Sequence, residues 1–536
     1  MQSRAKILCS VTASIVASLG VQQARAALSF SVVNVIPNSQ SSETDTNAEA
    51  NIAINPNNAQ QVLVSAFNNQ VGTAGQPYFL SANGSDWKNW SVADTEVHTD
   101  TTIDWSPTGN IYMSRLFSNA GNDDVAIHRS SPPNPPVALA EQKRLSALFA
   151  ATDPDQPWTK VTQNGADDRV YASLNDLGRP AAGNRASASV MFSLNANAGA
   201  GGTYKIAQIE RGNPFVQDVA GVRIAPRPGS NTVYAAFERP TANGALNANN
   251  FTGQVIVVRD DNAGNGAGVG TEFTGLGTLG SNALGFNVTK ELPFSLGAAR
   301  AGGTTLGKER LGSDLSIAVD PTNANRLYLA YCTAEQDPAD GNKVKPRINI
   351  VVSDSNGSGW SNERKLEFNT ALPALAVAGN GMLGIEYTEL SGNQMKTHFS
   401  SVSYDDFTTF VTNFDTLRTN NVLSTFDQTT VNSAVGPYIG DYQDLEAVGD
   451  TFYGAFAASN DPQAANFPEG CYYQRNWSTG TMDFNGGPIM GNGNSLIDAA
   501  SISIDPYFFK VQVPEPTALA IVALVSTIPT LRRQRR

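Results

Sequence analysis

The sequence has little cysteine and little histidine: three residues of each in 536. The histidines His98, His128 and His398 are scattered, and no HExxH motif occurs, which argues against zinc or iron catalysis. No CxxC motif and no GxSxG motif is present, so neither thiol redox chemistry nor a serine-hydrolase elbow is expected. Cys332 and Cys471, the two cysteines beyond the N-terminal segment, make no disulfide framework, and the sequence leaves open whether they pair.

Charged residues are also scarce, at 16% of the chain against a usual ~25%. This excludes a charge-rich disordered chain and a long coiled coil. The net charge of −12 argues against non-specific nucleic-acid binding, which needs a basic surface. Hydrophobic residues make up 41%, and 47 glycines and 28 prolines indicate many turns. The length fits three or four domains, or one large all-β domain.

Residues 1–26 have the three parts of a secretory signal peptide. Arg4 and Lys6 precede an apolar stretch from Ile7 to Val21, and Ala24-Arg25-Ala26 forms an A-x-A site. This order predicts export and cleavage after Ala26 by signal peptidase. Residues 27–46 would then form a lead-in that contains one strand.

The C-terminal segment, residues 511–536, carries the motif Pro514-Glu515-Pro516, an apolar stretch from Thr517 to Leu531 and an arginine-rich end. Fifteen apolar residues are fewer than the ~20 that span a bilayer, and arginines stay cytoplasmic. The segment resembles the PEP-CTERM sorting signal, which an exosortase reads in the bacterial envelope. The resemblance implies cleavage near Pro514, Glu515 and Pro516 and delivery to the cell surface or extracellular matrix. An uncleaved transmembrane tail anchor is the alternative.

Residues 47–510 contain a unit that recurs seven times, made of an apolar strand, a tight turn and a second strand. The fifth copy is the clearest, with Leu315–Val319 followed by Leu327–Tyr331. The other copies begin at or near these residues: Asn51, Thr102, Trp158, Val222, Ala374 and Leu445. A third apolar run follows most units, and a fourth is plausible. Such four-stranded units predict an all-β fold, a β-propeller of about seven blades, with six or eight as alternatives.

Two further features belong to this prediction. An end strand, either residues 30–35 or residues 508–513, should close the ring, because an unpaired outer edge invites aggregation. The Gly-, Asn- and Thr-rich stretch 240–310 is expected to be a long surface loop.

Two turn sequences resemble the Asp-box, or BNR repeat, of sialidase-like propellers. Ser353, Gly357 and Trp360 match its pattern Ser-x-Asp-x-Gly-x-Thr-Trp, while Ser355 and Gly359 depart from it. Residues 81–87 form a poorer copy. The resemblance implies that these polar residues close the hairpin turn between the third and fourth strands of a blade. It indicates the fold more than an activity.

An acidic residue stands three positions before the first apolar strand position in six of the seven units. These residues are Glu49, Asp100, Asp155, Asp218, Asp314 and Asp441. On a propeller they would ring one mouth of the channel, and such a ring could recruit Ca²⁺. The competing interpretation is that they accept hydrogen bonds from backbone N–H groups between blades. Without residues 1–26 and 514–536 the chain has 29 basic and 47 acidic residues, a net charge of −18 that attracts cations.

The sequence favours an exported, non-catalytic surface module that binds a glycan or a protein. The alternative is a sialidase-like glycoside hydrolase, and the resemblance implies that this needs three arginines, a Tyr-Glu nucleophile pair and an Asp acid/base. Arg223-Ile-Ala-Pro226 is the nearest match to the arginine motif, and it departs from it by an inserted Ala. Tyr438, Tyr442 and Glu446 cluster near Asp441 without an assigned role. Ligand and oligomeric state cannot be predicted from the sequence.

Overall fold

The computed structural model describes residues 28–40, 46–68, 77–90, 98–119, 122–130, 139–148, 154–176, 188–199, 202–210, 221–243, 250–264, 271–279, 283–295, 314–337, 340–409, 421–431, 438–474 and 503–513. Ala26, Asp218, Pro514, Glu515 and Pro516 lie outside these ranges, and so do the predicted signal peptide and C-terminal hydrophobic segment. Within the ranges, no helix has the length and hydropathy that crossing a membrane requires.

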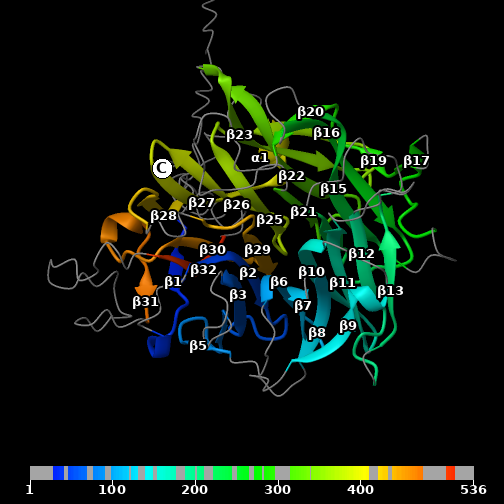
Figure 1. Ribbon diagram of the computed structural model, residues 1–536, viewed down its shortest axis with the longest axis horizontal. Coiled ribbons are helices and arrows are strands. Elements are labelled where there is room, and N and C mark those ends of the chain that lie inside the picture. The colour runs from blue at the N-terminus through cyan, green and yellow to red at the C-terminus, as the bar shows by residue number, and fades with distance from the viewer. Residues whose placement is uncertain are drawn as a thin grey trace, which may run out of the picture.

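Seven sheets form the blades of a propeller, and their strands pair antiparallel except for one parallel pair in the last blade (Figure 1). Blade 1 consists of β2 (Asn47–Ile54), β3 (Val62–Asn68), β4 (Tyr78–Ser81) and β5 (Trp87–Asn89). Blade 2 consists of β6 (His98–Trp105), β7 (Ile111–Asn119), β8 (Asn122–Ser130) and β9 (Ala140–Arg144). Blade 3 consists of β10 (Pro154–Asn164), β11 (Asp167–Asp176), β12 (Ala188–Ser193) and β13 (Tyr204–Gln208).

Blades 4 to 6 continue the ring. Blade 4 consists of β14 (Arg223–Pro226), β15 (Val233–Asn243), β16 (Asn250–Asp260), β19 (Phe286–Asn287) and β20 (Leu292–Ser295). Blade 5 consists of β21 (Leu315–Val319), β22 (Leu327–Asp337), β23 (Asp340–Ser353) and β24 (Ser361–Lys365). Blade 6 consists of β25 (Thr370–Val377), β26 (Leu383–Ser391), β27 (Gln394–Val402) and β28 (Asn421–Asp427). A separate small hairpin consists of β17 (Thr278–Leu279) and β18 (Ala283–Leu284).

Blade 7 joins the two ends of the chain. It consists of β29 (Asp444–Val448), β30 (Thr451–Ser459), β32 (Ile504–Gln512), β1 (Phe30–Asn34) and β31 (Tyr472–Tyr473). β1 pairs antiparallel with β32, with Val33 opposite Phe508. The expectation that one end strand closes the ring was too narrow, because both end strands take part. Among the described residues, helix is confined to α1 (Tyr404–Thr409) and the short 3-10 turns η1 (Asn38–Gln40), η2 (Leu145–Ala147) and η4 (Ala464–Asn466).

The first strand of each blade faces the centre, which confirms the prediction of an all-β propeller with seven blades. Each of these strands contacts the first strand of the next blade, and β29 contacts β2, so the circle closes. The seven strands are β2, β6, β10, β14, β21, β25 and β29. Residues at matching points of these strands therefore face one shared axis.

The blades pack through side chains that are buried on both faces of each sheet. All eight residues of β2 are buried, and Tyr112, Tyr171, Tyr234 and Tyr328 on the second strands of blades 2 to 5 are fully buried. Small residues make room for these large ones. A Cβ at Gly384 would lie 2.5 Å from the ring of Phe452 in the next blade. Strands buried on both faces explain why these segments read as continuous small and β-branched runs rather than as alternating patterns.

The stretch 240–310 is only in part the surface loop that the sequence suggested. It contains β16, whose residues Val255–Val258 are fully buried, and the short strands β17 to β20. The composition was misleading because polar residues flank a buried strand. Cys332 and Cys471 are both buried and unpaired, so the open question of a bridge between them is answered.

The two turn sequences close hairpins between third and fourth strands, as expected for such a device. In blade 5 the Oγ of Ser353 accepts a hydrogen bond from the N–H of Gly357 at 3.0 Å, and the indole N–H of Trp360 donates to the Gly357 carbonyl at 3.1 Å. In blade 1 the Oγ of Ser81 accepts from the N–H of Gly84 at 2.8 Å. These contacts satisfy backbone groups that a tight turn leaves open.

Candidate functional site

Polar side chains on the inner strands satisfy backbone donors of the following blade. The Oγ1 of Thr102 accepts from the N–H of Thr159 at 2.8 Å, and the Oγ of Ser316 accepts from the N–H of Leu375 at 2.9 Å. Carboxylates of the inner strands make the same contact. Asp104 accepts a hydrogen bond from the N–H of Val161. Glu446 accepts from the N–H of Ile54 at 3.2 Å, and Asp314 accepts from the N–H of Leu372 at 3.1 Å. An inner strand is a sheet edge, so its N–H groups need such partners.

The predicted ring acids lie near the start of the inner strands, but not at one equivalent position. In blades 1, 2, 3 and 6 this start is a bulge in which two residues oppose one. Glu49 is the first bulge residue and has a φ of +54°, whereas Asp100 is the second and Asp155 precedes the bulge. The three-residue spacing therefore overlooked the inserted residue.

Glu49, Tyr438, Asp441, Asp100 and Arg223, here called the mouth cluster, surround the start of the inner strands. The phenolic O–H of Tyr438 donates to Oε1 of Glu49 in a short hydrogen bond, and the N–H of Asp441 points to the same oxygen at 3.4 Å. The Glu49 N–H donates to the Ile439 carbonyl at 3.1 Å. The loop that precedes β29 is thus joined to the first residues of β2.

A close backbone contact fixes this arrangement. Gly440 has a φ of +105°, and a Cβ there would lie 2.4 Å from Cγ and 2.5 Å from N of Glu49. Only glycine fits such an approach. The backbone therefore holds Glu49 against the loop that carries Tyr438 and Asp441.

Arg223 brings a cation to the cluster from blade 4. Its guanidinium lies 4.3 Å from the ring centroid of Trp158 and donates to Oε1 of Gln156 at 3.3 Å. The Gln156 amide in turn donates to Oδ2 of Asp441 at 3.2 Å. Trp158 also meets Tyr442 edge to face, with centroids 5.5 Å apart. A chain of contacts therefore connects blades 4, 3, 7 and 1 at the mouth.

The electrostatics of the cluster keep its tyrosines protonated. Burial raises the pKa of Tyr438 well above its usual range, and the charges of Glu49 and Asp441 raise it further. Burial has the same effect on Tyr442, assisted by Glu49 and Asp100. A base that takes the proton of Tyr438 would have to contact its hydroxyl group, and Glu49 supplies the carboxylate that does so.

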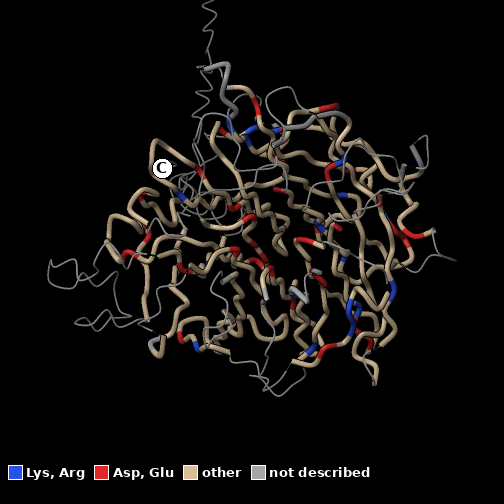
Figure 2. Tube along the Cα trace, viewed as in Figure 1, with Lys and Arg blue, Asp and Glu red and all other residues tan. Residues whose placement is uncertain are grey.

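A second charged group lies further along the channel. The Nζ of Lys160 is 3.0 Å from Oε1 of Glu446 and 3.7 Å from Oδ2 of Asp444. Burial raises the pKa of Glu446 to about 8 and that of Asp104 to about 6, although Lys160 opposes both shifts. Figure 2 shows acidic positions along the strands at the centre of the ring.

The channel contains a cavity of about 180 Å³ between these two groups. Lys160, Arg223 and Asp444 line it together with Trp158 and apolar residues of β14, β21 and β25. The cavity is large enough for several water molecules or one small polar group. It connects the mouth cluster to a polar and partly apolar interior.

The structure brings Glu49, Asp100 and Asp441 into one electrostatic neighbourhood, and Asp314 acts on Arg223. Asp314 accepts the N–H of Leu372 in the next blade at 3.1 Å, the kind of contact that the competing interpretation proposed, whereas Asp155 accepts the N–H of its own neighbour Gln156 at 3.0 Å within blade 3. Across the described ranges no group of three or more His, Cys, Asp or Glu side chains could hold a metal ion. Among the ring residues, Glu49, Asp155, Asp314 and Asp441 accept hydrogen bonds, and the cation ring stays a prediction.

Sequence reasoning noted Tyr438 without a role and missed Gln156, Trp158 and Lys160. Tyr438 and Glu49 are 389 positions apart, and no periodicity links a loop residue to a strand of another blade. Arg223, whose surrounding sequence departs from the arginine motif by an inserted Ala, is a member of the cluster. The seven-unit repeat was the signal that placed all these strands around one axis.

No family model and no curated protein matches the chain. Similar solved structures include an α-L-arabinofuranosidase from Fusarium graminearum, 10% identical, covering 70% of this chain and 98% of its own, with a TM-score of 0.40. An α-L-arabinanase from Penicillium chrysogenum is 8% identical, covering 68% and 91%, with a TM-score of 0.34. A protein of unknown function from Dyadobacter fermentans is 9% identical, covering 90% and 98%, with a TM-score of 0.34.

These neighbours correct the functional prediction. The propellers with a named activity are glycoside hydrolases, which contradicts the prediction of a non-catalytic binding module. The likeness is low in both identity and TM-score, so it carries no argument about this chain. Activity therefore has to be argued from the mouth cluster itself.

Proposed function

We propose that this chain is a glycoside hydrolase whose active site is the mouth cluster. The observation that carries the proposal is the hydrogen bond from the Tyr438 hydroxyl to Glu49, with the carboxyls of Asp441 and Asp100 in the same neighbourhood. Glycoside hydrolysis needs a nucleophile or base and a separate acid on opposite sides of the scissile bond. Some glycosidases use tyrosine as the nucleophile, and such a tyrosine needs a carboxylate to take its proton.

In this mechanism Glu49 takes the proton of Tyr438 while the phenolate oxygen attacks the anomeric carbon. The leaving oxygen receives a proton from a carboxylic acid, which is Asp100 or Asp441. Water then attacks the anomeric carbon of the glycosyl-tyrosine while the carboxylate left by the acid takes a proton from the water, and Glu49 returns its proton to the departing oxygen of Tyr438. Since the pKa of Tyr438 is raised by burial, proton transfer to Glu49 has to accompany the attack.

Activity should be measured on the full chain with a panel of fluorogenic glycosides and with polysaccharides. We expect Glu49→Gln and Tyr438→Phe each to lower kcat by about 10²–10⁴-fold, the usual contribution of an acid–base or nucleophilic group. Asp100→Asn and Asp441→Asn then identify the acid, because the acid variant keeps activity on substrates with good leaving groups. Tyr331→Phe is the matched control, since Tyr331 donates to Glu363 at 2.8 Å on the outer side of blade 5. Full activity in Tyr438→Phe, or equal losses in Tyr331→Phe, would contradict the assignment.

The predicted signal peptide and the C-terminal segment support a second proposal, about where the protein acts. We propose cleavage after Ala26 by signal peptidase, followed by exosortase cleavage near Pro514-Glu515-Pro516 and release at the cell surface. Mass spectrometry of protein from the producing cells should find a chain that begins at Ala27 and ends close to Val513. Replacing Glu515 with Ala should leave the C-terminal segment uncut. An intact C-terminus in the surface fraction would contradict exosortase processing.

A further inference from the structure

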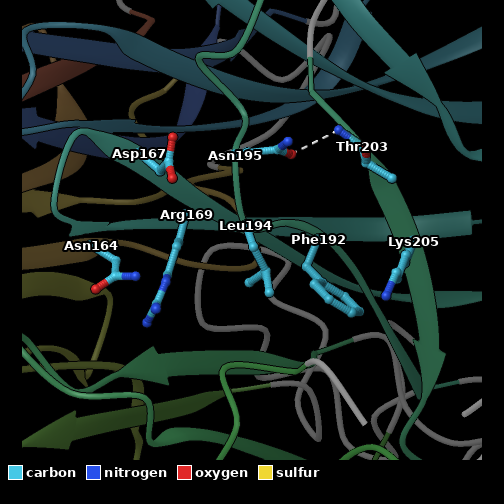
Figure 3. Close-up of a pocket in the computed structure, with 8 residues that line it drawn as sticks. All are labelled: Asn164, Asp167, Arg169, Phe192, Leu194, Asn195, Thr203 and Lys205. Carbon is cyan, nitrogen blue, oxygen red and sulfur yellow. Dashed lines mark hydrogen bonds between the residues drawn. The ribbon is translucent and has the colours of Figure 1, made fainter. Parts of the chain in front are cut away.

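We infer a second ligand site, distinct from the mouth cluster, in a pocket of blade 3 that binds a carboxylate about the size of one uronic acid. The pocket has a volume of about 410 Å³ and lies beside the turns that join β10 to β11 and β12 to β13. Its lining includes Asn164, Arg169, Phe192, Leu194, Thr203 and Lys205 (Figure 3). We call it the outer pocket.

Arg169 is a buried cation without an acidic partner in the described part of the chain. The residue is 7% exposed, and its Nη1 donates to Oδ1 of Asn231 at 2.8 Å and to the Ser230 carbonyl at 3.3 Å. Its buried Nε has no hydrogen-bond partner. A buried guanidinium that lacks a counter-charge is costly, which is why such groups usually meet a carboxylate.

The unoccupied donors of Arg169 have the geometry that an oxyacid needs. The Nε and Nη2 atoms form one edge of the planar guanidinium, and this edge binds the two oxygens of a carboxylate side by side. Figure 3 shows Arg169 and Lys205 pointing the same way along the pocket, while Asp167 points away from the guanidinium. The lining of the pocket therefore contains two cations and one carboxylate, a positive balance although the protein as a whole is acidic.

The rest of the lining selects the body of the ligand. Phe192 is 1% exposed and stacks on Tyr171, with ring centroids 6.3 Å apart, so it makes a rigid apolar floor beside Leu194. Asn164 and Thr203 add polar groups at the rim. A carboxylate on a compact ring with hydroxyl groups matches this combination, and ligand pockets of this size hold small molecules rather than chains.

Binding should be measured by calorimetry on the full chain that carries Glu49→Gln, with sodium glucuronate as the probe and glucose as the neutral comparison. We expect glucuronate to bind at least about tenfold more tightly than glucose, since a charge-assisted bidentate pair is roughly twice as strong as a neutral hydrogen bond. Arg169→Gln should remove this difference. Arg169→Lys should lose part of it, because lysine keeps the charge without the fork.

Arg227→Gln is the matched control. Arg227 is 9% exposed and donates to the Asp320 and Asn323 carbonyls of blade 5, much as Arg169 contacts the turn of blade 4, but it does not line the outer pocket. Glucuronate binding that survives in Arg169→Gln, or that Arg227→Gln abolishes equally, would overturn the assignment. Inorganic phosphate that binds as tightly as glucuronate would also overturn it, because the site would then recognise charge alone. Thermal unfolding of Arg169→Gln checks folding, and Arg169→Lys provides the test if that variant unfolds.

Discussion

At the residue scale, Glu386 is the clearest buried acid outside the mouth cluster. It is fully buried between blades 6 and 7, and neither carboxyl oxygen has a hydrogen-bond partner among the described residues. Burial raises the pKa of Glu386 well above the ordinary value of a glutamate, and the charge of Asp444 adds to this. The side chain therefore keeps its proton to a higher pH in the folded protein than in the unfolded chain.

This difference in proton binding fixes the direction in which the free energy of unfolding changes with pH. The folded state binds more protons than the unfolded state above pH 4.5, so the free energy of unfolding falls as pH rises, by up to about 1.4 kcal/mol per pH unit from this group. Glu386→Gln should remove that slope, and the variant should gain stability relative to the parent between pH 5 and pH 8. Urea unfolding at the two pH values measures the effect, with the exposed Glu141→Gln as control. A constant difference between variant and parent across this range would show that Glu386 is not protonated by folding.

Gly440 is the second position where a single residue decides the local structure. We expect Gly440→Ala to destabilise the fold by about 2 kcal/mol or more, because its Cβ would overlap Glu49 and its φ is +105°. Gly449→Ala is the control, since Gly449 has a φ of +58° but nothing within 4 Å of an added Cβ, and it should cost about 1 kcal/mol. Denaturant unfolding compares the two. Equal losses would mean that the contact with Glu49 adds nothing to the backbone strain.

Some residues of the mouth cluster could be predicted from the sequence, but the arrangement of their side chains could not. The acids at the start of the inner strands were found because the strand repeat fixed their positions. The bulge that shifts Asp100 relative to Glu49 leaves no mark on the sequence, since it depends on how a strand pairs with its neighbour. The hydrogen bond between Tyr438 and Glu49 forms because the ring closes. The repeat pattern predicts that the ring closes, but it does not predict which side chains then meet.

At the scale of elements, the inner strands were predictable and the outer strands were not. The first two strands of most blades are largely buried, so their apolar runs stand out. The outer strand β24 alternates between exposed and half-buried residues and contains charged side chains, so it resembles a loop. β19 has two residues, too few for any period to show. The blade count was recoverable because it depends on the inner strands alone.

The hairpin turns show how one element-scale task is met by different residues. Ser353 and Ser81 use a hydroxyl at the end of the third strand, and in blade 4 the carboxylate of Asp260 accepts the N–H groups of Asn262 and Gly264 at 2.7 and 2.8 Å. All three satisfy turn donors with a short acceptor side chain. This explains why the turn motif is degenerate along the chain while the geometry repeats.

At the scale of the whole molecule, the candidate active site exists only in the closed ring. The mouth cluster takes Glu49 from blade 1, Asp100 from blade 2, Arg223 from blade 4, and Tyr438 and Asp441 from the loop before blade 7. Closure itself depends on β1, whose Asn34 donates to Oδ2 of Asp505 at 2.7 Å. The strand that completes the last blade therefore helps to hold the closed ring on which the mouth cluster depends.

Deleting residues 28–36 should open the ring. Val32, Val33, Val35 and Ile36 are at most 1% exposed, and burying each contributes about 1.5–3 kcal/mol, which in sum approaches the whole stability of a typical domain. The deletion also leaves β32 with an unpaired edge, so we expect aggregation and loss of cooperative unfolding together with loss of glycosidase activity. Adding a synthetic peptide of residues 28–40 in excess should restore both, while a peptide with Val33→Asp should not, because Val33 packs against blade 1 and pairs with Phe508. A shortened chain that stays monomeric with an unchanged melting temperature would show that the other six blades hold the ring without this strand.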